Sequence, residues 1–260
     1  MNNQMYYVHP NAKIGKNVTI EPFAVIYDDV EIGDDCWIGP HVTIFPGARI
    51  GKNCKIFPGA SIAATPQDLK FEGEYTTAEI GDNNIIREFV TINRGTNASK
   101  RTVIGNNNLI MAYAHVAHDC IVGDNCILAN SATLAGHVEV DDYAIIGGQS
   151  AIHQFCRIGK HVILMGGSLV DKDIPPYVKG GKFPVSYCGI NSVGLSRRGY
   201  STETINNIQN IYRVVFQKGL TYTNALAEIK QLPQTKEGDE IISFMEKAER
   251  GLMKGFTSVR

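Results

Sequence analysis

The sequence repeats with a period of six residues over most of its length. In one register, every sixth residue is Ile, Val or Leu over 8–62, 80–92 and 104–170, which gives 25 aliphatic positions without an exception. An α-helix would repeat every 3.6 residues and a half-buried strand every two, so neither accounts for this pattern. It predicts short strands separated by tight turns.

The other positions of each six-residue unit are patterned as well. If the aliphatic residue is counted as the first, the second is often Gly, the third and fourth are polar turn-forming residues, and the fifth is nearly always small. We expect Gly or Asn to adopt positive φ in these turns. The aliphatic and small residues would point inward, and successive coils would stack their strands in parallel.

Two stretches, near 65–79 and 97–103, interrupt this pattern. They carry charge and lack inward aliphatic residues, yet the register returns unchanged after each. They predict loops that project from an edge of the coil stack. Long ordered loops on a rigid scaffold are common sites of function, although a surface loop without a role is the alternative.

A different periodicity follows the last six-residue unit. Apolar residues at helical spacing begin after Ser201, which is a candidate N-cap, and Gly219 is a candidate C-terminal stop. Two further helical patterns cover 225–232 and 240–252. The tail is therefore predicted to be α-helical.

The two periodicities divide the chain into a predicted parallel β-helix over 1–190 and a C-terminal α-helical domain over 191–260. A chain of 260 residues is long enough for one sizeable core with a small appendage. The helical tail can cover the unpaired strand edges at the end of the coil stack.

Composition narrows the class of protein. The net charge of −1 gives no excess of basic residues, so we expect no nucleic-acid partner. No stretch approaches the roughly 18 apolar residues that span a bilayer, so no integral membrane segment is expected. The N-terminus has no basic region followed by an apolar run, so no secretory signal is visible. A cytoplasmic protein is the expectation.

The six-residue pattern resembles the hexapeptide-repeat acyltransferases. Coils in that group are triangular prisms, and each coil is built from three six-residue units. The resemblance implies an all-β, left-handed parallel β-helix, a hand that the general rule for parallel crossovers does not predict. It also implies a homotrimer with active sites between subunits.

Four of the seven histidines cluster in the middle coils: His115, His118, His137 and His153. With three units per coil, His118 lies under Gly136, and Asp119 lies under His137. Several histidines that converge on one edge favour a general-base or metal site over a coincidental cluster.

Several short motifs sharpen the resemblance. Ala-His-Val-Ala-His-Asp-Cys at 114–120, His-Gln-Phe-Cys at 153–156, Arg-Gly-Thr at 94–96 and Gly-Leu-Ser-Arg-Arg-Gly at 194–199 are similar to the UDP-N-acetylglucosamine O-acyltransferase family. The resemblance implies transfer of an acyl chain, with or without a 3-hydroxyl group, from an acyl carrier protein thioester to the 3-hydroxyl of UDP-N-acetylglucosamine, the first step of lipid A biosynthesis. The phosphopantetheine belongs to the donor, so no cofactor and no metal are expected.

The resemblance also implies roles for individual residues. His118 would be the general base, the N–H of Gly136 would stabilise the oxyanion, and Asp119 would orient or polarise a histidine, although adjacent side chains on a strand point apart. The implied substrate contacts are Asp68, Lys70, Asn93, His115, His137, His153, Gln154, Asn191, Arg197 and Arg198. The implied ruler for the acyl chain is Ile163, Met165 and Gly166.

Two positions depart from the family pattern. Asn93 stands where the family often has His, and Val193 replaces an acidic residue of the nucleotide segment. Neither departure affects the predicted base. The sequence leaves open the acyl-chain length and whether the acceptor carries a 3-hydroxyl or a 3-amino group.

The six cysteines are not expected to be nucleophiles. Five of them occupy the small fifth position of their units, which predicts buried thiols that pack as small apolar groups. Only Cys188 lies outside this pattern.

Three alternatives remain at the level of sequence. A metal lyase similar to the γ-class carbonic anhydrases would use the histidines to bind Zn²⁺. The N-acyltransferase of the same pathway normally carries an added N-terminal domain, for which units that begin at Val8 leave no room. A non-enzymatic binding platform would leave the clustered histidines unexplained.

Overall fold

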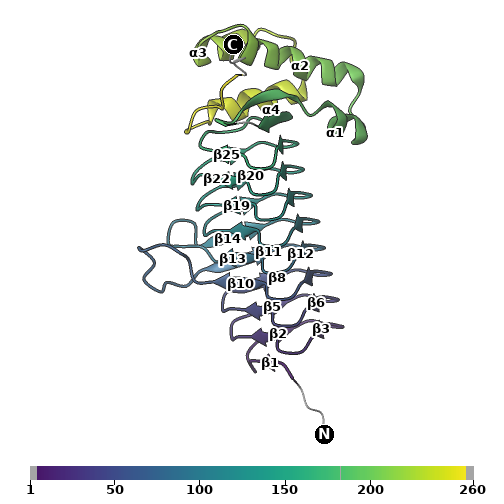
Figure 1. Ribbon diagram of the computed structural model, residues 1–260, viewed down its shortest axis with the longest axis vertical. Helices are drawn as coiled ribbons and strands as arrows, with labels where there is room; N and C mark the ends of the chain where they lie inside the picture. The colour runs from purple at the N-terminus through teal and green to yellow at the C-terminus, as the bar shows by residue number, and fades with distance from the viewer. Residues whose placement is uncertain (1–4, 182, 256–260) are drawn as a thin grey trace.

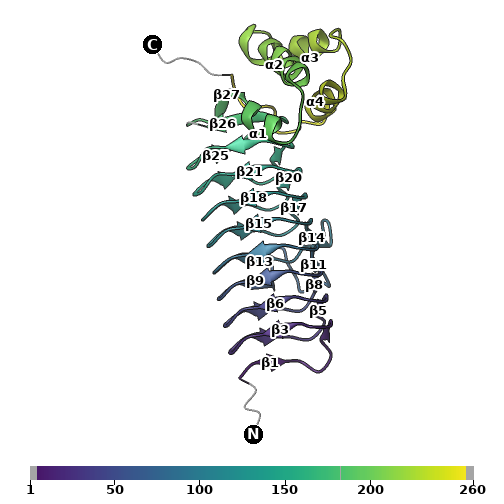
Figure 2. The same cartoon turned by 90° about the vertical axis from the view of Figure 1, so that its right-hand side faces the viewer.

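The computed structural model describes residues 5–181 and 183–255 and shows a stack of parallel coils with helices at its C-terminal end (Figure 1). Each coil contributes one short strand to each of three sheets, which we call faces A, B and C. The coils lie one above another along the long axis (Figure 2).

The strands of the three faces are as follows. Face A contains β1 (Tyr7–Val8), β4 (Val25–Ile26), β7 (Thr43–Ile44), β10 (Ser61–Ala64), β13 (Thr91–Asn93), β16 (His115–Val116), β19 (Thr133–Leu134), β22 (Ala151–Ile152) and β25 (Leu169–Val170). Face B contains β2 (Lys13–Ile14), β5 (Glu31–Ile32), β8 (Ala48–Ile50), β11 (Thr77–Ile80), β14 (Arg101–Ile104), β17 (Ile121–Val122), β20 (Glu139–Val140) and β23 (Arg157–Ile158). Face C contains β3 (Thr19–Ile20), β6 (Trp37–Ile38), β9 (Lys55–Ile56), β12 (Ile85–Ile86), β15 (Leu109–Ile110), β18 (Ile127–Leu128), β21 (Ile145–Ile146), β24 (Ile163–Leu164), β26 (Val178–Gly181) and β27 (Ser186–Ile190).

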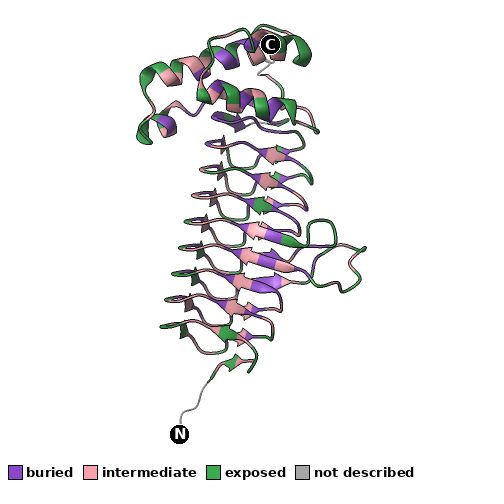
Figure 3. Ribbon diagram, turned by 180° about the vertical axis from the view of Figure 1, so that it is seen from behind, coloured by how far each residue is buried: buried purple, intermediate pink, exposed green. Residues whose placement is uncertain are grey.

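The strand register confirms the predicted coil of three six-residue units. Val116 pairs with Leu134, and Leu134 pairs with Ile152, in parallel alignment along face A. Each of the predicted aliphatic positions lies in one of the strands β1 to β25, and all of them from Ile26 onward are buried. The first three are only partly buried because they lie at the open N-terminal end of the stack. Figure 3 shows buried positions recurring in the strands from coil to coil.

The turns differ from the expectation that Gly or Asn would supply positive φ. Positive φ recurs at the fourth position of the units, where Phe23 (65°), Asp119 (61°) and His137 (62°) stand as well as Asn. Positive φ does not explain why Gly recurs at the second position of the units. At Gly33, an added Cβ would lie 2.7 Å from the carbonyl of Gly51 in the next coil. Close contact between coils therefore selects Gly there.

The edge between faces B and C shows how this contact is made. The backbone N–H of Asn106 donates to Asp124 Oδ1 (2.6 Å), and the N–H of Asp124 donates to Asp142 Oδ1 (2.7 Å). At this edge, an Asp or Asn at the third position of a unit thus accepts a hydrogen bond from the coil below. This ladder leaves no room for a side chain at the preceding glycine.

Both predicted loops project from the edge between faces A and B, which we call the A/B edge (Figure 1). The first covers 65–76 and is shorter than predicted, whereas the second covers 94–100 and begins and ends three residues earlier than predicted. Thr77–Ile80 and Arg101–Ile104 are strands, because they pair with each other along face B. Face B continues from Ile50 to Ile80 and from Ile80 to Ile104, so the first loop adds the length of two six-residue units to the regular coil and the second adds one.

Four helices follow the last strands. They are α1 (Ser192–Arg197), α2 (Thr202–Gln217), α3 (Tyr222–Ile229) and α4 (Lys236–Glu246). Ser201 is the N-cap of α2, and Gly219 has a φ of 69° just beyond its end, as predicted. The sequence missed α1, and α3 and α4 begin and end earlier than the patterns at 225–232 and 240–252 indicated, because Thr221 and Thr235 cap their N-termini.

The helical tail packs on the C-terminal end of the coil stack. Strands β26 and β27 form an antiparallel hairpin that continues face C. Tyr212 of α2 is fully buried and donates to the carbonyl of Pro176 (2.5 Å). None of the helices in the described ranges is long and apolar enough to span a membrane.

The contact between coils yields a stability prediction. In Gly105→Ala, the new Cβ would lie 2.3 Å from Asp124 Oδ1 and 2.7 Å from the carbonyl oxygen of Gly123. We expect the coils to be forced apart and the free energy of unfolding to fall by about 2 kcal/mol, as for other overpacked sites. Denaturant unfolding followed by circular dichroism measures the change. An unchanged midpoint would show that coil contact does not select glycine here.

Candidate active site

The A/B edge holds both loops and three of the four clustered histidines. His118, His137 and His153 lie in the turns that follow β16, β19 and β22, in three successive coils. The backbone N–H of His137 donates to the carbonyl of His118 (3.1 Å), which agrees with the predicted stacking of Gly136 over His118 and of His137 over Asp119. The register of three units per coil thus brings together side chains that are far apart in the sequence.

His118 and Asp119 form a hydrogen-bonded pair, which we call the dyad. His118 Nδ1 lies 2.8 Å from Asp119 Oδ2. The expectation that adjacent side chains point apart is wrong here, because the two residues lie in a turn and not on a strand. The positive φ of Asp119 (61°) directs its carboxylate back toward the preceding residue.

The carboxylate of Asp119 is completely buried. It accepts hydrogen bonds from the backbone N–H of Thr96 (2.9 Å), from the hydroxyl of Thr96 (2.7 Å) and from the hydroxyl of Ser99. Burial opposes ionisation, but hydrogen bonds from Ser99, Thr96 and His118 outweigh it and hold the pKa of Asp119 well below its usual range. The carboxylate is therefore ionised at neutral pH.

Gly136 packs directly on the ring of His118. A Cβ at this position would lie 2.6 Å from Cε1 and 2.8 Å from Nε2 of His118. Only glycine therefore leaves space for a reacting group beside Nε2. The N–H of Gly136 donates to no acceptor within residues 5–181 and 183–255, so it is available to a ligand.

The other two histidines near the dyad are held by their neighbours. His137 stacks on Phe155 with ring centroids 4.6 Å apart, and His115 Nδ1 lies 2.7 Å from the hydroxyl of Thr91 on face A. Burial lowers the pKa of both, and for His115 the nearby His118 adds to this effect. Both imidazoles are thus favoured in the neutral form, as hydrogen-bonding groups.

The dyad and His137 also form a group of potential metal ligands. One ligand atom from each of His118, Asp119 and His137 lies within 4.8 Å of the others. However, both oxygens of Asp119 already accept hydrogen bonds from loop 94–100 and from His118. A cation would have to displace these donors, so the geometry favours proton transfer over metal binding.

An open cleft of about 600 Å³ lies over this part of the A/B edge. Ser99, Asp119, His137 and Phe155 line one part of it, and Arg157 and Lys247 line the other. The cleft reaches Asp119 and His137, whereas His118 and Gly136 are not among its lining residues.

Loop 65–76 carries the predicted contacts Asp68 and Lys70, of which Asp68 lies near enough to act on His137. Lys70 is exposed, and its backbone N–H donates to Asp68 Oδ1 (2.9 Å). The charge of Asp68 acts on His137 and partly opposes the lowering of its pKa. Asn93 is buried and donates to the carbonyl of Thr65 (3.0 Å), so in this chain it ties the base of the loop.

His153 and Gln154 are exposed in the turn one coil above Gly136. His153 Nδ1 lies 3.2 Å from a guanidinium nitrogen of Arg250, which the sequence did not single out. The C-terminal segment brings this arginine to the A/B edge, since Leu252 pairs with Asp173.

The remaining predicted residues lie on other edges of the same chain. Asn191 is buried and caps α1, because it accepts from Gly194 (3.1 Å) and donates to the carbonyl of His161 (2.9 Å). Arg198 is exposed and lies over the ring of Tyr143, 5.0 Å from its centroid, at the edge between faces B and C. Exposed Arg197 ends α1.

The predicted ruler residues lie away from both of these groups. Ile163 points outward from face C, and exposed Met165 and Gly166 form the turn between faces C and A. A single chain therefore does not gather the predicted base, nucleotide residues and ruler into one pocket.

Two residues that donate hydrogen bonds to the carboxylate of Asp119 were missed. Thr96 was noted only as part of Arg-Gly-Thr, and Ser99 only as part of a loop. Both lie in a loop outside the six-residue repeat, so the spacing along the sequence does not predict their contact with Asp119.

The cysteines lie as predicted. Five are buried, and Cys188 is partly exposed. Burial raises the pKa of Cys120 to about 12, which disfavours a thiolate.

Comparisons with known proteins show which families and relatives this chain resembles. Residues 173–253 match a family profile described as UDP-N-acetylglucosamine O-acyltransferase, domain 2, and residues 11–46 and 101–136 match bacterial transferase hexapeptide repeats. The acyl-[acyl-carrier-protein]–UDP-N-acetylglucosamine O-acyltransferase of Thiobacillus denitrificans is 43% identical over 249 residues, which cover 95% of this chain and 96% of the relative.

Solved structures agree with the sequence relatives. The UDP-N-acetylglucosamine acyltransferase of Bacteroides fragilis superimposes with a TM-score of 0.95 at 50% identity, covering 98% of this chain and 100% of that chain. LpxA of Acinetobacter baumannii gives 0.94 at 41% identity, covering 96% and 98%. The coil stack is thus a left-handed parallel β-helix. With this similarity along nearly its whole length, the chain belongs to the UDP-N-acetylglucosamine O-acyltransferase family.

Proposed function

We propose that this chain transfers an acyl group from an acyl carrier protein thioester to the 3-hydroxyl of UDP-N-acetylglucosamine, the first step of lipid A biosynthesis. One observation carries the chemistry: in a member of this family, His118 is hydrogen-bonded to Asp119 and packs against Gly136, and an open cleft reaches Asp119 and His137. Family membership also overrides the carbonic-anhydrase-like, N-acyltransferase and non-enzymatic alternatives.

The reaction is a direct acyl transfer. The sugar oxygen attacks the thioester carbonyl carbon while His118 Nε2 takes its proton, because Nδ1 is already bonded to Asp119. The N–H of Gly136, one coil above, would stabilise the oxyanion. Collapse of the intermediate breaks the C–S bond, and the imidazolium returns the proton to the leaving thiolate of the carrier protein.

The chain itself needs no cofactor for this step. The phosphopantetheine that bears the thioester arrives on the donor protein, and no covalent acyl-enzyme is formed. The donor is a soluble carrier protein, so we propose that the reaction takes place in the cytoplasm.

A homotrimer would complete the site. The dyad lies at the A/B edge, whereas Arg198 lies at the edge between faces B and C. Face C also presents an outward stripe of aliphatic residues, whereas face B carries charged pairs such as Glu79–Arg101. The stripe consists of Ile85, Leu109, Ile127, Ile145 and Ile163. Apolar stripes of this kind mark association surfaces, and closed symmetry would bring the edges of different copies together.

The first functional prediction concerns the base. His118→Ala should lower kcat/KM by about 100-fold or more, because it removes the proton acceptor beside the sugar hydroxyl. Binding of UDP-N-acetylglucosamine should change far less. Product formation from acyl carrier protein thioesters, followed by mass spectrometry, measures the loss.

Two controls belong to this experiment. His41→Ala removes another exposed histidine of a turn, stacked on Phe23 far from the dyad, and should leave turnover unchanged. Alkylation of accessible thiols should also leave the wild type active. Near-full activity of His118→Ala, with a cysteine variant inactive, would refute direct transfer.

A second prediction separates proton transfer from metal catalysis. Because the oxygens of Asp119 are already hydrogen-bonded, activity should survive prolonged treatment with EDTA. Elemental analysis of the purified protein should find less than one zinc per chain. If EDTA abolishes turnover and Zn²⁺ specifically restores it, the metal alternative is correct.

The third prediction concerns assembly. Sedimentation equilibrium should give about three times the chain mass of 28.5 kDa. Ile127→Lys, in the middle of the aliphatic stripe, should shift the protein toward monomer and reduce activity, because a buried unpaired charge would disfavour the interface. The matched change Ile121→Lys on face B should have little effect on mass. An active wild-type monomer would rule out the shared site.

A further inference from the structure

Loop 94–100 encloses the carboxylate of Asp119. Asp119 Oδ1 accepts from the N–H of Thr96 (2.9 Å), the N–H of Ser99 (3.2 Å) and the hydroxyl of Ser99. Asp119 Oδ2 accepts from the hydroxyl of Thr96 (2.7 Å) and from His118 Nδ1 (2.8 Å). The carboxylate is thus almost saturated with donors, only one of which is a histidine.

Two histidines are close enough to compete for the same oxygen. His118 Nδ1 lies 2.8 Å from Asp119 Oδ2, whereas His137 Nε2 lies 3.7 Å from it, beyond hydrogen-bonding distance. A carboxylate oxygen offers about two lone-pair sites. With one site used by Thr96 and the other by His118, none is left for His137.

We propose that Thr96 and Ser99 are positioning residues that reserve the carboxylate of Asp119 for His118 and exclude His137. This inference rests on the proposed function, in which His118 is the general base. The hydroxyl of Thr96 blocks the lone pair that His137 would otherwise use. Ser99 holds the second oxygen, so the carboxylate cannot rotate.

The hydrogen bond between Asp119 and His118 determines which nitrogen of His118 accepts the proton of the sugar hydroxyl. A proton on Nδ1 is required for donation to Asp119, so Nε2 keeps its lone pair. Nε2 is the atom beside Gly136, where a Cβ would lie 2.8 Å away. If the carboxylate turned to His137, His118 would be free to adopt the other tautomer, with a proton on Nε2 and no basic site toward the sugar.

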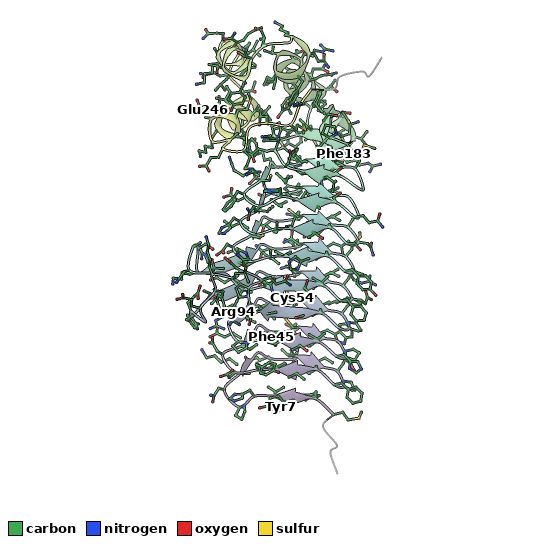
Figure 4. The ribbon with its side chains drawn as sticks, turned by 60° about the vertical axis from the view of Figure 1, so that its left-hand side comes forward. Tyr7, Phe45, Cys54, Arg94, Phe183 and Glu246 are labelled. Atoms are coloured by element: carbon green, nitrogen blue, oxygen red, sulfur yellow. The ribbon has the colours of Figure 1, made fainter. Side chains whose placement is uncertain are left out.

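The loop is braced to hold this position. The N–H of Asn97 donates to Glu74 Oε1 of the other loop (2.9 Å). The guanidinium of Arg94 lies over the ring of Phe71, 5.4 Å from its centroid, and Figure 4 shows Arg94 at the base of the projecting loops. On the other side, Thr102 Oγ1 accepts from the backbone N–H of Asp119 (2.9 Å).

The experiment replaces one hydroxyl by a methyl group. Thr96→Val should lower kcat by about 10-fold with little change in the KM for UDP-N-acetylglucosamine, the scale expected when the partner of an orienting carboxylate is lost. Thr96→Ser keeps the hydroxyl and should retain most of the activity. Thr76→Val is the matched control, because the buried hydroxyl of Thr76 has no hydrogen-bond partner among the described residues.

A double-mutant cycle tests whether Thr96 acts through Asp119. In the Asp119→Asn background, Thr96→Val should cause no further loss of kcat, because the carboxylate that it positions is already gone. A purely structural role of Thr96 would give the same loss in both backgrounds. Equal losses, or full activity of Thr96→Val, would overturn the proposal.

Two further measurements distinguish a failure of this inference from a failure of the proposed function. Ser99→Ala changes an exposed loop residue and should also lower kcat, so it serves if Thr96→Val fails to fold. Histidine-selective ¹⁵N NMR reads the tautomer of His118 without substrate, and Thr96→Val should increase its Nε2–H form. An unchanged tautomer would reject the inference, whereas full activity of His118→Ala would reject the base itself.

Discussion

The backbone hydrogen bonds between successive coils are the constraint on which the rest of the structure depends. Each coil strand pairs in parallel with the equivalent strand of the next coil, as Val116 does with Leu134, so outside the two insertions a position lies over its counterpart three units further along the chain. The interior must then accept an aliphatic residue at each level. The same closeness of coils admits only glycine where backbones touch, as at Gly33.

Because equivalent positions form columns, the edges of the prism can carry different chemistry. The edge between faces B and C is a structural ladder of Asp and Asn side chains that accept from the coil below. The A/B edge holds His118, His137 and His153 and both insertions, which add the length of two units and of one unit. Whole units leave the register intact, so the insertions enlarge one edge without disturbing the core.

The chemistry of the dyad follows from burial combined with hydrogen bonding. An isolated buried carboxylate would be costly to ionise, but donors from Thr96, Ser99 and His118 stabilise the charge of Asp119. The fixed charge orients the imidazole, and the small Gly136 leaves space beside its free nitrogen. These three features together make a proton acceptor, and none of them requires a metal.

The sequence by itself determined the short strands of the six-residue repeat, their inward aliphatic positions, the burial of five cysteines and the capping of α2 by Ser201. These features follow from local or periodic rules. Family resemblance supplied the coil of three units, and with it the stacking of Gly136 over His118, as well as the left hand of the helix; the hydrogen-bond ladder between coils then converts spacing along the chain into proximity in space. Only the tertiary structure decided that Asp119 turns back onto His118, that Thr96 and Ser99 enclose it, and that Asn191 caps α1. Those contacts depend on a positive φ in one turn and on where a non-periodic loop closes, and no spacing in the sequence encodes either.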